Sequence, residues 1–549
     1  MPREGQSGRC SVPRHKQWHK GFRKFKVQVG AFGREISGVL TGLFGSRSCR
    51  VKHPGRDYLI MNDGIKHAAT HGLFWSFIEH IGHQGVQFLI AVILARLLLP
   101  EQFGLIAMLT IFMAVAQSLV NSGFGSALIQ KQDANHLDEC SIFFFTILVG
   151  FLVTGILFLS APWIAAFYQV SHLTTLARVL SLNLIINAFG IVHITLLTKR
   201  IDFKTQMKIG IIATALSGSI GVTMAYQGYG VWSLVAQSIG GNLFRATLLW
   251  FFLPWRPTWI FSWVALRSMF SFGSKLLFSG LLDTIYNNLY LVVIGKMFSA
   301  TDLGYYTRAQ QTQQLPVDSL YSTVGRVTFP IFSSMQDDKA RLKRGTRKAL
   351  TTLVTVNFPL MIGLAVVAKP LVLVLLTDKW LPCVPYLQLL CMAGLLYPLH
   401  AINLNVLIAQ GRSDLFFRLE IYKKAMITAA ICLTWRWGIL ALIYGQIATS
   451  VIAYYMNSYY TGKLLSYPVE EQLKDIVPIL CLASLMGCGV YLSGYFHIQS
   501  TIVLLFSQVS MGVILYIILC SLANLSSFID IRSMAQEVYH SLGHRGANH

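Results

Sequence analysis

The sequence predicts an all-α polytopic membrane protein with about fourteen transmembrane helices. Of its 549 residues, 54% are hydrophobic and only 12% are charged, which is too little charge for the surface of a water-soluble globule. The charges gather in short clusters between apolar runs of roughly 20 residues, the length that spans the hydrocarbon core of a bilayer. The formal net charge of +22 is typical of a membrane protein with basic cytoplasmic loops, so it does not predict a nucleic-acid partner.

Each apolar run is predicted to form one helix, and the polar clusters are predicted to form the loops. The runs lie near residues 73–97, 103–121, 140–161, 176–197, 208–227, 230–253, 270–295, 304–334, 350–377, 384–409, 419–437, 438–461, 475–496 and 499–522. The run at 304–334 differs from the others because it is amphipathic and rich in Gln. A twelve-helix alternative would lack the last two runs.

Lys and Arg are distributed unequally between the two sets of predicted connections. The connections on the side of the N-terminus, together with the C-terminal tail, hold 22 of these residues, and the opposite connections hold six. The six are Arg96, Arg178, Lys296, Arg308, Lys379 and Arg436. Because cytoplasmic connections carry the excess of Lys and Arg, this distribution predicts an even number of helices with both termini inside.

Residues 1–60 differ from the rest of the chain. They contain thirteen Lys and Arg residues against three acids and have no apolar run, which predicts a disordered segment and not a signal peptide. The segment is either a basic tail that touches anionic headgroups or a stretch that precedes a true start at Met61.

An internal repeat at an offset of 200 relates ILARLLLPEQFGLIA (93–107) to VIGKMFSATDLGYYT (293–307), and it aligns Arg96 with Lys296 and Gly104 with Gly304. Because six helices separate the copies, the repeat predicts two lobes related by an axis along the membrane normal, which is a transporter architecture. The alternative is two ordinary loops that share a Gly. The predicted parts are an N-lobe at 61–260, a C-lobe at 261–465, and two further helices with a cytoplasmic tail at 466–549.

Motifs for metal binding and catalysis are missing from the sequence. The nine Cys residues contain no CxxC pair, and His80 and His83 have no third ligand nearby, so we expect neither a disulfide nor a metal site. No GxSxG, P-loop or paired-carboxylate motif stands in a suitable context. The sequence therefore predicts a protein that is not an enzyme and has no cofactor.

Three segments within residues 73–204 carry a family resemblance: LFWSFIEHIGHQGVQFLIAVILARLLLPEQFGLIAM, NSGFGSALIQKQD and LARVLSLNLIINAFGIVHITLLTKRIDFK. Together with TRAQQTQQLPVDSLYSTVGRVTFPIFSSMQDD (307–338), they resemble the polysaccharide exporters and O-antigen flippases of the multidrug/oligosaccharidyl-lipid/polysaccharide (MOP) superfamily, in particular its colanic acid and teichuronic acid exporter branch. The resemblance implies two six-helix lobes around a central cavity. It also implies that the protein moves undecaprenyl-diphosphate-linked oligosaccharides across the bacterial inner membrane by alternating access, among membrane lipids and with polysaccharide polymerase and chain-length machinery as partners.

Polar side chains within the predicted helices are the candidates for lining that cavity, because such groups are scarce in lipid and usually face the interior. The candidates are Glu79, His83, Gln87, Asn121, Asn187, Arg245, Asp283, Asn287, Arg308, Gln311, Arg326 and Lys369. Glu79, His83 and Gln87 share one helix face because they are four residues apart. The alternative for the amide side chains is hydrogen bonding between helices.

Arg308, Arg326 and Lys369 are the candidates for binding a diphosphate, since Arg offers a planar fork and Lys a point charge to phosphate oxygens. Alternatively, Arg308 and Lys369 extend to the membrane interface, and Arg326 pairs with Asp318. Asp283 either pairs with one of these bases or titrates as the coupling site of a proton-driven cycle.

Two other functions remain open. One is a multidrug or toxin extruder of the same superfamily, which would need a compact cation or proton site in an acidic, aromatic pocket. The other is a membrane polysaccharide polymerase, which would need a large outward loop, whereas the outward connections predicted here are short.

Overall fold

The computed structural model describes residue 82, residues 84–121, 123–131, 133–495 and 499–533, and residue 536, with the backbone alone at 272, 318, 319, 321–327 and 329. Residues 75–531 form one unit, to which the following description applies. The predicted segment 1–60, the alternative start at Met61, and the candidates Glu79 and His83 lie outside the described residues.

The described part of this unit is built from helices. The first half contains a helix at Gln84–Leu97, then α3 (Pro100–Asn121), α4 (Phe124–Gln130), α5 (His136–Tyr168), α6 (Leu173–Lys199), α7 (Phe203–Tyr226) and α8 (Val231–Phe252). The second half contains α9 (Trp263–Met297), α10 (Ala300–Ser334), α11 (Lys339–Val366), α12 (Ala368–Leu375), η1 (Asp378–Trp380), α13 (Cys383–Leu395), α14 (Tyr397–Ala409), α15 (Ser413–Thr434), η2 (Trp435–Trp437), α16 (Ile439–Leu465), α17 (Val469–Ser493) and α18 (Thr501–Leu522).

Helix formation at the predicted runs confirms the all-α fold for the described residues. Within them, ten helical segments are long and apolar enough to cross a membrane. The other four predicted runs fall on Gln84–Leu97, α8, α10 and α15, which are shorter or less apolar. The total of fourteen spans therefore stays a prediction.

Several predicted boundaries are wrong. The basic run at 339–349 is not a loop: it forms the first turns of α11, and the Asp338 carboxylate caps that helix by accepting from the Arg341 N–H at 2.9 Å. The predicted span 350–377 breaks at Val367, while α11 continues through Pro359. Pro370 lies in the first turn of α12, where a missing N–H leaves no helical hydrogen bond unmade. The predicted span 384–409 breaks at Leu396 into α13 and α14.

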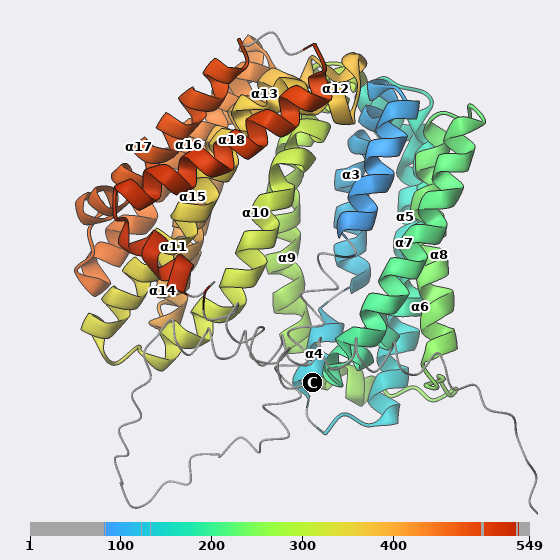
Figure 1. Ribbon diagram of the computed structural model, residues 1–549. Coiled ribbons are helices and arrows are strands. Elements are labelled where there is room, and N and C mark those ends of the chain that lie inside the picture. The colour runs from blue at the N-terminus through green and yellow to red at the C-terminus, as the bar shows by residue number, and fades with distance from the viewer. Residues whose placement is uncertain are drawn as a thin grey trace, which may run out of the picture. The chain divides into compact units, whose positions relative to one another are not determined.

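The helices pack as two groups, coloured from blue to green and from yellow to red in Figure 1. In the first group α5 packs on α6 and α7 on α8; in the second, α10 packs on α13 and α14, α11 on α17, and α15 on α16. Helix α9 lies along α3, α4 and α5 although the sequence assigns it to the C-lobe, and α10 lies along α3. The lobe boundary at residue 260 stays a prediction.

Helices α3 and α10 cross near their first turns in a reciprocal contact. A Cβ added at Gly104 of α3 would overlap the carbonyl group of Ala300, and one added at Gly304 of α10 would overlap the carbonyl group of Pro100. These are the two glycines that the repeat aligns, and each meets the start of the other helix. A reciprocal contact of this kind is what a duplicated chain with a two-fold relation would produce.

The aligned bases Arg96 and Lys296 each donate hydrogen bonds to a helix from the other half of the chain. Arg96 belongs to the first half of the chain and donates to the carbonyls of Val374 and Leu375 at the end of α12, in the second half. Its Nε lies 2.8 Å from the Leu375 carbonyl oxygen. Lys296 lies in the last turn of α9 and donates to the carbonyl of Phe167 at the end of α5. Each cation therefore lies at the C-terminal end of a helix from the other half, where the helix dipole favours positive charge.

Helix α17 is attached to the second group through buried polar side chains. The Gln472 side chain is fully buried; its amide nitrogen donates to Asn403 Oδ1 at 3.2 Å and to the Tyr467 carbonyl at 3.1 Å. Its amide oxygen accepts from Ser458 Oγ at 3.1 Å and from the Tyr454 hydroxyl at 3.3 Å. The first of the two C-terminal helices is therefore an integral part of this group.

We expect Gln472→Leu to lower the stability of the purified protein by about 2 to 4 kcal/mol, because it leaves several buried hydrogen-bonding groups without a partner. The thermal unfolding midpoint in detergent would measure the loss. Gln388→Leu is the matched control, since Gln388 is an exposed Gln on α13. Equal midpoints for the two variants would contradict the proposed attachment.

Candidate functional site

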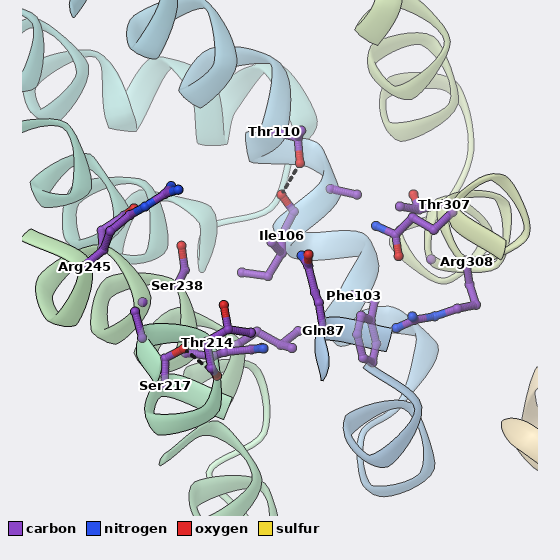
Figure 2. Close-up of a pocket in the computed structure, with 18 of the residues that line it drawn as sticks. Gln87, Phe103, Ile106, Thr110, Thr214, Ser217, Ser238, Arg245, Thr307 and Arg308 are labelled. Carbon is purple, nitrogen blue, oxygen red and sulfur yellow. Dashed lines mark hydrogen bonds between the residues drawn. The ribbon is translucent and has the colours of Figure 1, made fainter. Parts of the chain in front are cut away.

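Three polar cavities lie along α10 among the described residues. The basic cavity has a volume of about 480 Å³ and lies between the Gln84–Leu97 helix, α3, α7, α8 and α10; Figure 2 shows it. The narrow cavity, of about 260 Å³, lies between the Gln84–Leu97 helix, α10 and α12. The neutral cavity, of about 610 Å³, lies between α9, α10, α13, α14, α15 and α16. Helix α10, the Gln-rich run of the sequence, contributes to all three walls.

The basic cavity brings together four of the predicted candidates. Gln87 lies on its first-helix wall, Arg245 on α8, and Arg308 with Gln311 on α10. Figure 2 shows Arg245 and Arg308 on opposite sides, with Gln87 between them. The described lining residues of this cavity include these two bases and no acid.

Arg308 is held between two aromatic side chains. Its guanidinium carbon lies 4.5 Å from the ring centre of Phe103 and 5.5 Å from that of Trp380. Trp380 is fixed in turn, because it is fully buried and its indole N–H donates to the Ala95 carbonyl at 2.8 Å. One aromatic side chain of α3 and one of η1 therefore hold a cation of α10 in place through cation–π contacts.

The charge of Arg308 is poorly compensated by the protein. The residue is only 6% exposed, and its Nε has no hydrogen-bond partner among the described residues. The two cation–π contacts stabilise the charge but accept no hydrogen bond from the Nε–H group. An anion in the cavity would supply the missing acceptor. The low exposure of Arg308 favours a cavity role over the alternative, in which its side chain extends to the membrane interface, and both stay predictions.

The narrow cavity adjoins the same residues. Gln87, Arg308 and Gln311 line both it and the basic cavity, and Gln314 lines both it and the neutral cavity. Side chains of α10 therefore form part of the wall of all three cavities, and neighbouring cavities share some of them.

The neutral cavity contains acids and bases that already pair with one another. Asp283 on α9 accepts from Lys424 on α15 at 2.6 Å, and Glu420 pairs with Lys423 one turn along the same helix. Pairing with Arg308, Arg326 or Lys369 was one of two alternatives for Asp283, and the described partner is Lys424 instead. The other alternative, titration as a coupling site, stays a prediction. Lys424 lies within α15, and its side chain is only 12% exposed.

Three other candidates lie elsewhere. Asn121 ends α3, is exposed, and accepts from Gln117 on the same helix at 3.0 Å. Asn187 and Lys369 line none of these three cavities, and Lys369 is exposed. The side chain of Arg326 lies outside the described residues, so its predicted roles stay predictions.

Asn183, which lies four residues before Asn187, forms hydrogen bonds between helices, the alternative role considered for the amide side chains. Its side chain donates to Ser238 Oγ at 3.1 Å and accepts from Asn242 Nδ2 at 3.1 Å, so it joins α6 to α8.

Small polar side chains of the cavity walls were not among the predicted candidates. In the basic cavity these include Thr110, Thr214, Ser217, Ser238 and Thr307. Ser and Thr are common in membrane helices and often bond to their own backbone, as Thr110 and Ser217 do here. Their presence in the sequence therefore carried no signal for a cavity.

One of the shifted pKa values outside the membrane-spanning helices belongs to Lys379. Burial lowers the pKa of Lys379, in η1, whose ammonium donates to the Arg96 carbonyl at 2.6 Å.

Comparison with known proteins gives a consistent family. The model of the family described as "Polysaccharide biosynthesis protein" matches residues 93–385, more than half of the chain. The chain is 29% identical over 423 residues to the teichuronic acid biosynthesis protein TuaB of Bacillus subtilis (strain 168), covering 74% of this chain and 85% of TuaB. It is 27% identical over 403 residues to the lipopolysaccharide biosynthesis protein WzxC of Escherichia coli (strain K12), covering 71% of this chain and 81% of WzxC.

Solved structures share the fold at low sequence identity. The lipid II flippase MurJ in an inward closed conformation superposes with a TM-score of 0.65 at 13% identity, covering 82% of this chain and 98% of MurJ. An inward-facing multidrug resistance MATE family transporter of the MOP superfamily gives 0.55 at 12% identity, covering 70% of this chain and 98% of the transporter. These likenesses establish a polytopic membrane fold of the MOP type.

Proposed function

This chain belongs to the polysaccharide biosynthesis protein family, and we propose that it translocates a polyprenyl-diphosphate-linked oligosaccharide across the bacterial inner membrane. The carrier would expose its cavities to the two sides in turn, with both termini inside. The relatives support this substrate class through their names, which are those of teichuronic acid and lipopolysaccharide biosynthesis proteins.

The observation that carries the proposal is the buried Nε of Arg308 on the wall of the basic cavity, which has no hydrogen-bond partner in the described part of the chain. A diphosphate presents oxygens that accept from a planar guanidinium, and such charge-assisted hydrogen bonds are strong in a desolvated site. Arg245 lines the same cavity on the opposite side. The polyprenyl chain needs no polar site, because it is compatible with the surrounding lipid.

Extrusion of cationic drugs is disfavoured by the same charges. A cation entering the basic cavity would meet two bases and no described acid. The MATE-type fold does not decide between the two functions, because it carries no information about the cargo. A polysaccharide polymerase, with its need for a large outward loop, is also disfavoured: the predicted outward helix connections remain short among the described residues.

Reconstitution would test the proposal. Purified protein in liposomes loaded with the lipid-linked oligosaccharide pool of the native strain should move that pool between leaflets, as measured by its access to an impermeant oxidant of sugars. The rate should exceed that of protein-free liposomes at least tenfold, and the protein should not accelerate ethidium movement. Movement of ethidium without movement of the oligosaccharide lipid would favour the extruder instead. Interaction with a polymerase and chain-length machinery stays a prediction.

A further inference from the structure

The neutral cavity differs from the basic cavity in its charge. Its lining residues include two acids and two bases, and the structure joins them as Asp283 with Lys424 and Glu420 with Lys423. Both charges of each pair are therefore compensated before any ligand arrives. A diphosphate would gain little in this cavity, because the ammonium groups are already engaged.

His400, the remaining titratable imidazole on this wall, is also engaged. Its Nε2 lies 3.0 Å from Ser450 Oγ, and its Nδ1 lies 3.1 Å from Asn457 Nδ2. Two hydrogen bonds to neutral groups keep the ring as part of the wall.

The rest of the lining suits a ligand rich in hydroxyl groups. Asn287, Gln310, Gln314 and Gln446 contribute amides, each of which can donate and accept at once, as a sugar hydroxyl also does. Tyr286 and other tyrosines of the wall add flat apolar faces with a polar edge. A volume of about 610 Å³ lies within the usual range for a site that encloses a small organic ligand.

The neutral cavity is also placed where the sugar end of an elongated substrate would reach. Arg308 and Gln314 lie six residues apart on α10, which corresponds to a rise of about 9 Å along the helix. Arg308 lines the basic and narrow cavities, and Gln314 lines the narrow and neutral cavities. An elongated ligand whose anionic end contacts Arg308 can thus extend an uncharged part along this helix.

We propose that the neutral cavity binds the sugars of the substrate while the basic cavity binds its diphosphate, an inference that rests on the proposed function. The charge pattern of the two cavities follows that of the substrate, which is anionic at the lipid linkage and polyhydroxylated beyond it. In this arrangement the basic cavity recognises what all such substrates share, and the neutral cavity recognises which glycan is attached.

Two ligands separate these contributions in binding measurements on the purified full-length protein. One is undecaprenyl diphosphate, which has no sugar, and the other is the lipid-linked oligosaccharide pool extracted from the native strain. The wild type should bind the pool at least tenfold more tightly than undecaprenyl diphosphate. Asn287→Ala combined with Gln310→Ala should reduce that preference to threefold or less, because both side chains line the neutral cavity and neither forms its ion pairs.

Controls assign each outcome. Gln388→Ala, on an exposed Gln of α13 outside the cavity, should keep the wild-type preference, whereas Arg308→Met should weaken both ligands by a similar factor. A wild type that binds neither ligand would remove the proposed function itself. A wild-type preference that survives the double substitution would overturn only the sugar site.

The ion pairs allow a second, independent test. Asp283→Asn with Lys424→Gln removes both charges while keeping hydrogen-bonding groups of similar size, and it should leave binding of the pool within about threefold of the wild type. If instead binding of undecaprenyl diphosphate depends on Na⁺ in the wild type and loses that dependence in this variant, the cavity is a cation site and the sugar assignment is overturned.

Discussion

Arg308→Met is expected to reduce oligosaccharide transport about 100-fold, which corresponds to about 3 kcal/mol of lost interaction with the diphosphate. Met retains an apolar stem that can pack between Phe103 and Trp380, but it removes the charge and the donors. Arg308→Lys keeps the charge and loses the planar fork, so we expect a smaller reduction of about tenfold. Initial rates in liposomes would measure both effects.

Lys369→Met is the matched control for this series. Lys369 is an exposed base of α12 that lines none of the three cavities, so its loss should leave transport within about twofold of the wild type. Unfolding midpoints would establish that each variant is folded. A folded Arg308→Met protein with normal transport would refute the role given to this base.

Gly104→Ala is expected to have the second large effect. The added methyl group would overlap the Ala300 carbonyl, and because that neighbour is backbone at the start of α10, a side-chain rotation cannot relieve the overlap. The helices α3 and α10 must move apart at this end or the protein must lose stability. We expect at least a tenfold fall in transport, with a lower unfolding midpoint or increased reactivity of a cysteine introduced near the crossing.

Gly304→Ala should behave like Gly104→Ala, since its added methyl group would meet the Pro100 carbonyl in the equivalent position. Gly155→Ala on α5 is the control, because an added Cβ at Gly155 has no neighbour within 4 Å. Wild-type transport and stability for both crossing variants would mean that α3 and α10 do not need this close contact.

The sequence was sufficient to place most helices, because long apolar runs allow few alternatives in a membrane. It was also sufficient to select Gln87, Arg245, Arg308 and Gln311, since polar groups within such runs usually face an interior. The same rule also selected Asn187 and Lys369, which line none of the three described cavities. A residue's position within a run states neither which neighbouring helix it meets nor whether its head group reaches the membrane surface.

Pairing between distant helices was beyond the sequence. Asp283 and Lys424 lie 141 residues apart, and only the packing of α9 near α15 brings the two charges together. The Gln-rich run at 304–334 was the least typical predicted span, and its polarity is explained by the three cavities that it borders.

Arg96 and Lys296 each bind a helix end in the other half of the chain, and this affects how the contact between the two halves can be lost. If α12 moved away from Arg96, the carbonyls at the end of α12 would lose a hydrogen-bond donor, and the same would happen to α5 if it moved away from Lys296. Because the reciprocal glycine crossing links α3 to α10, we expect both helix ends to lose their donors at the same time. Such a junction would respond in an all-or-none manner, so that intermediate degrees of separation would be sparsely populated.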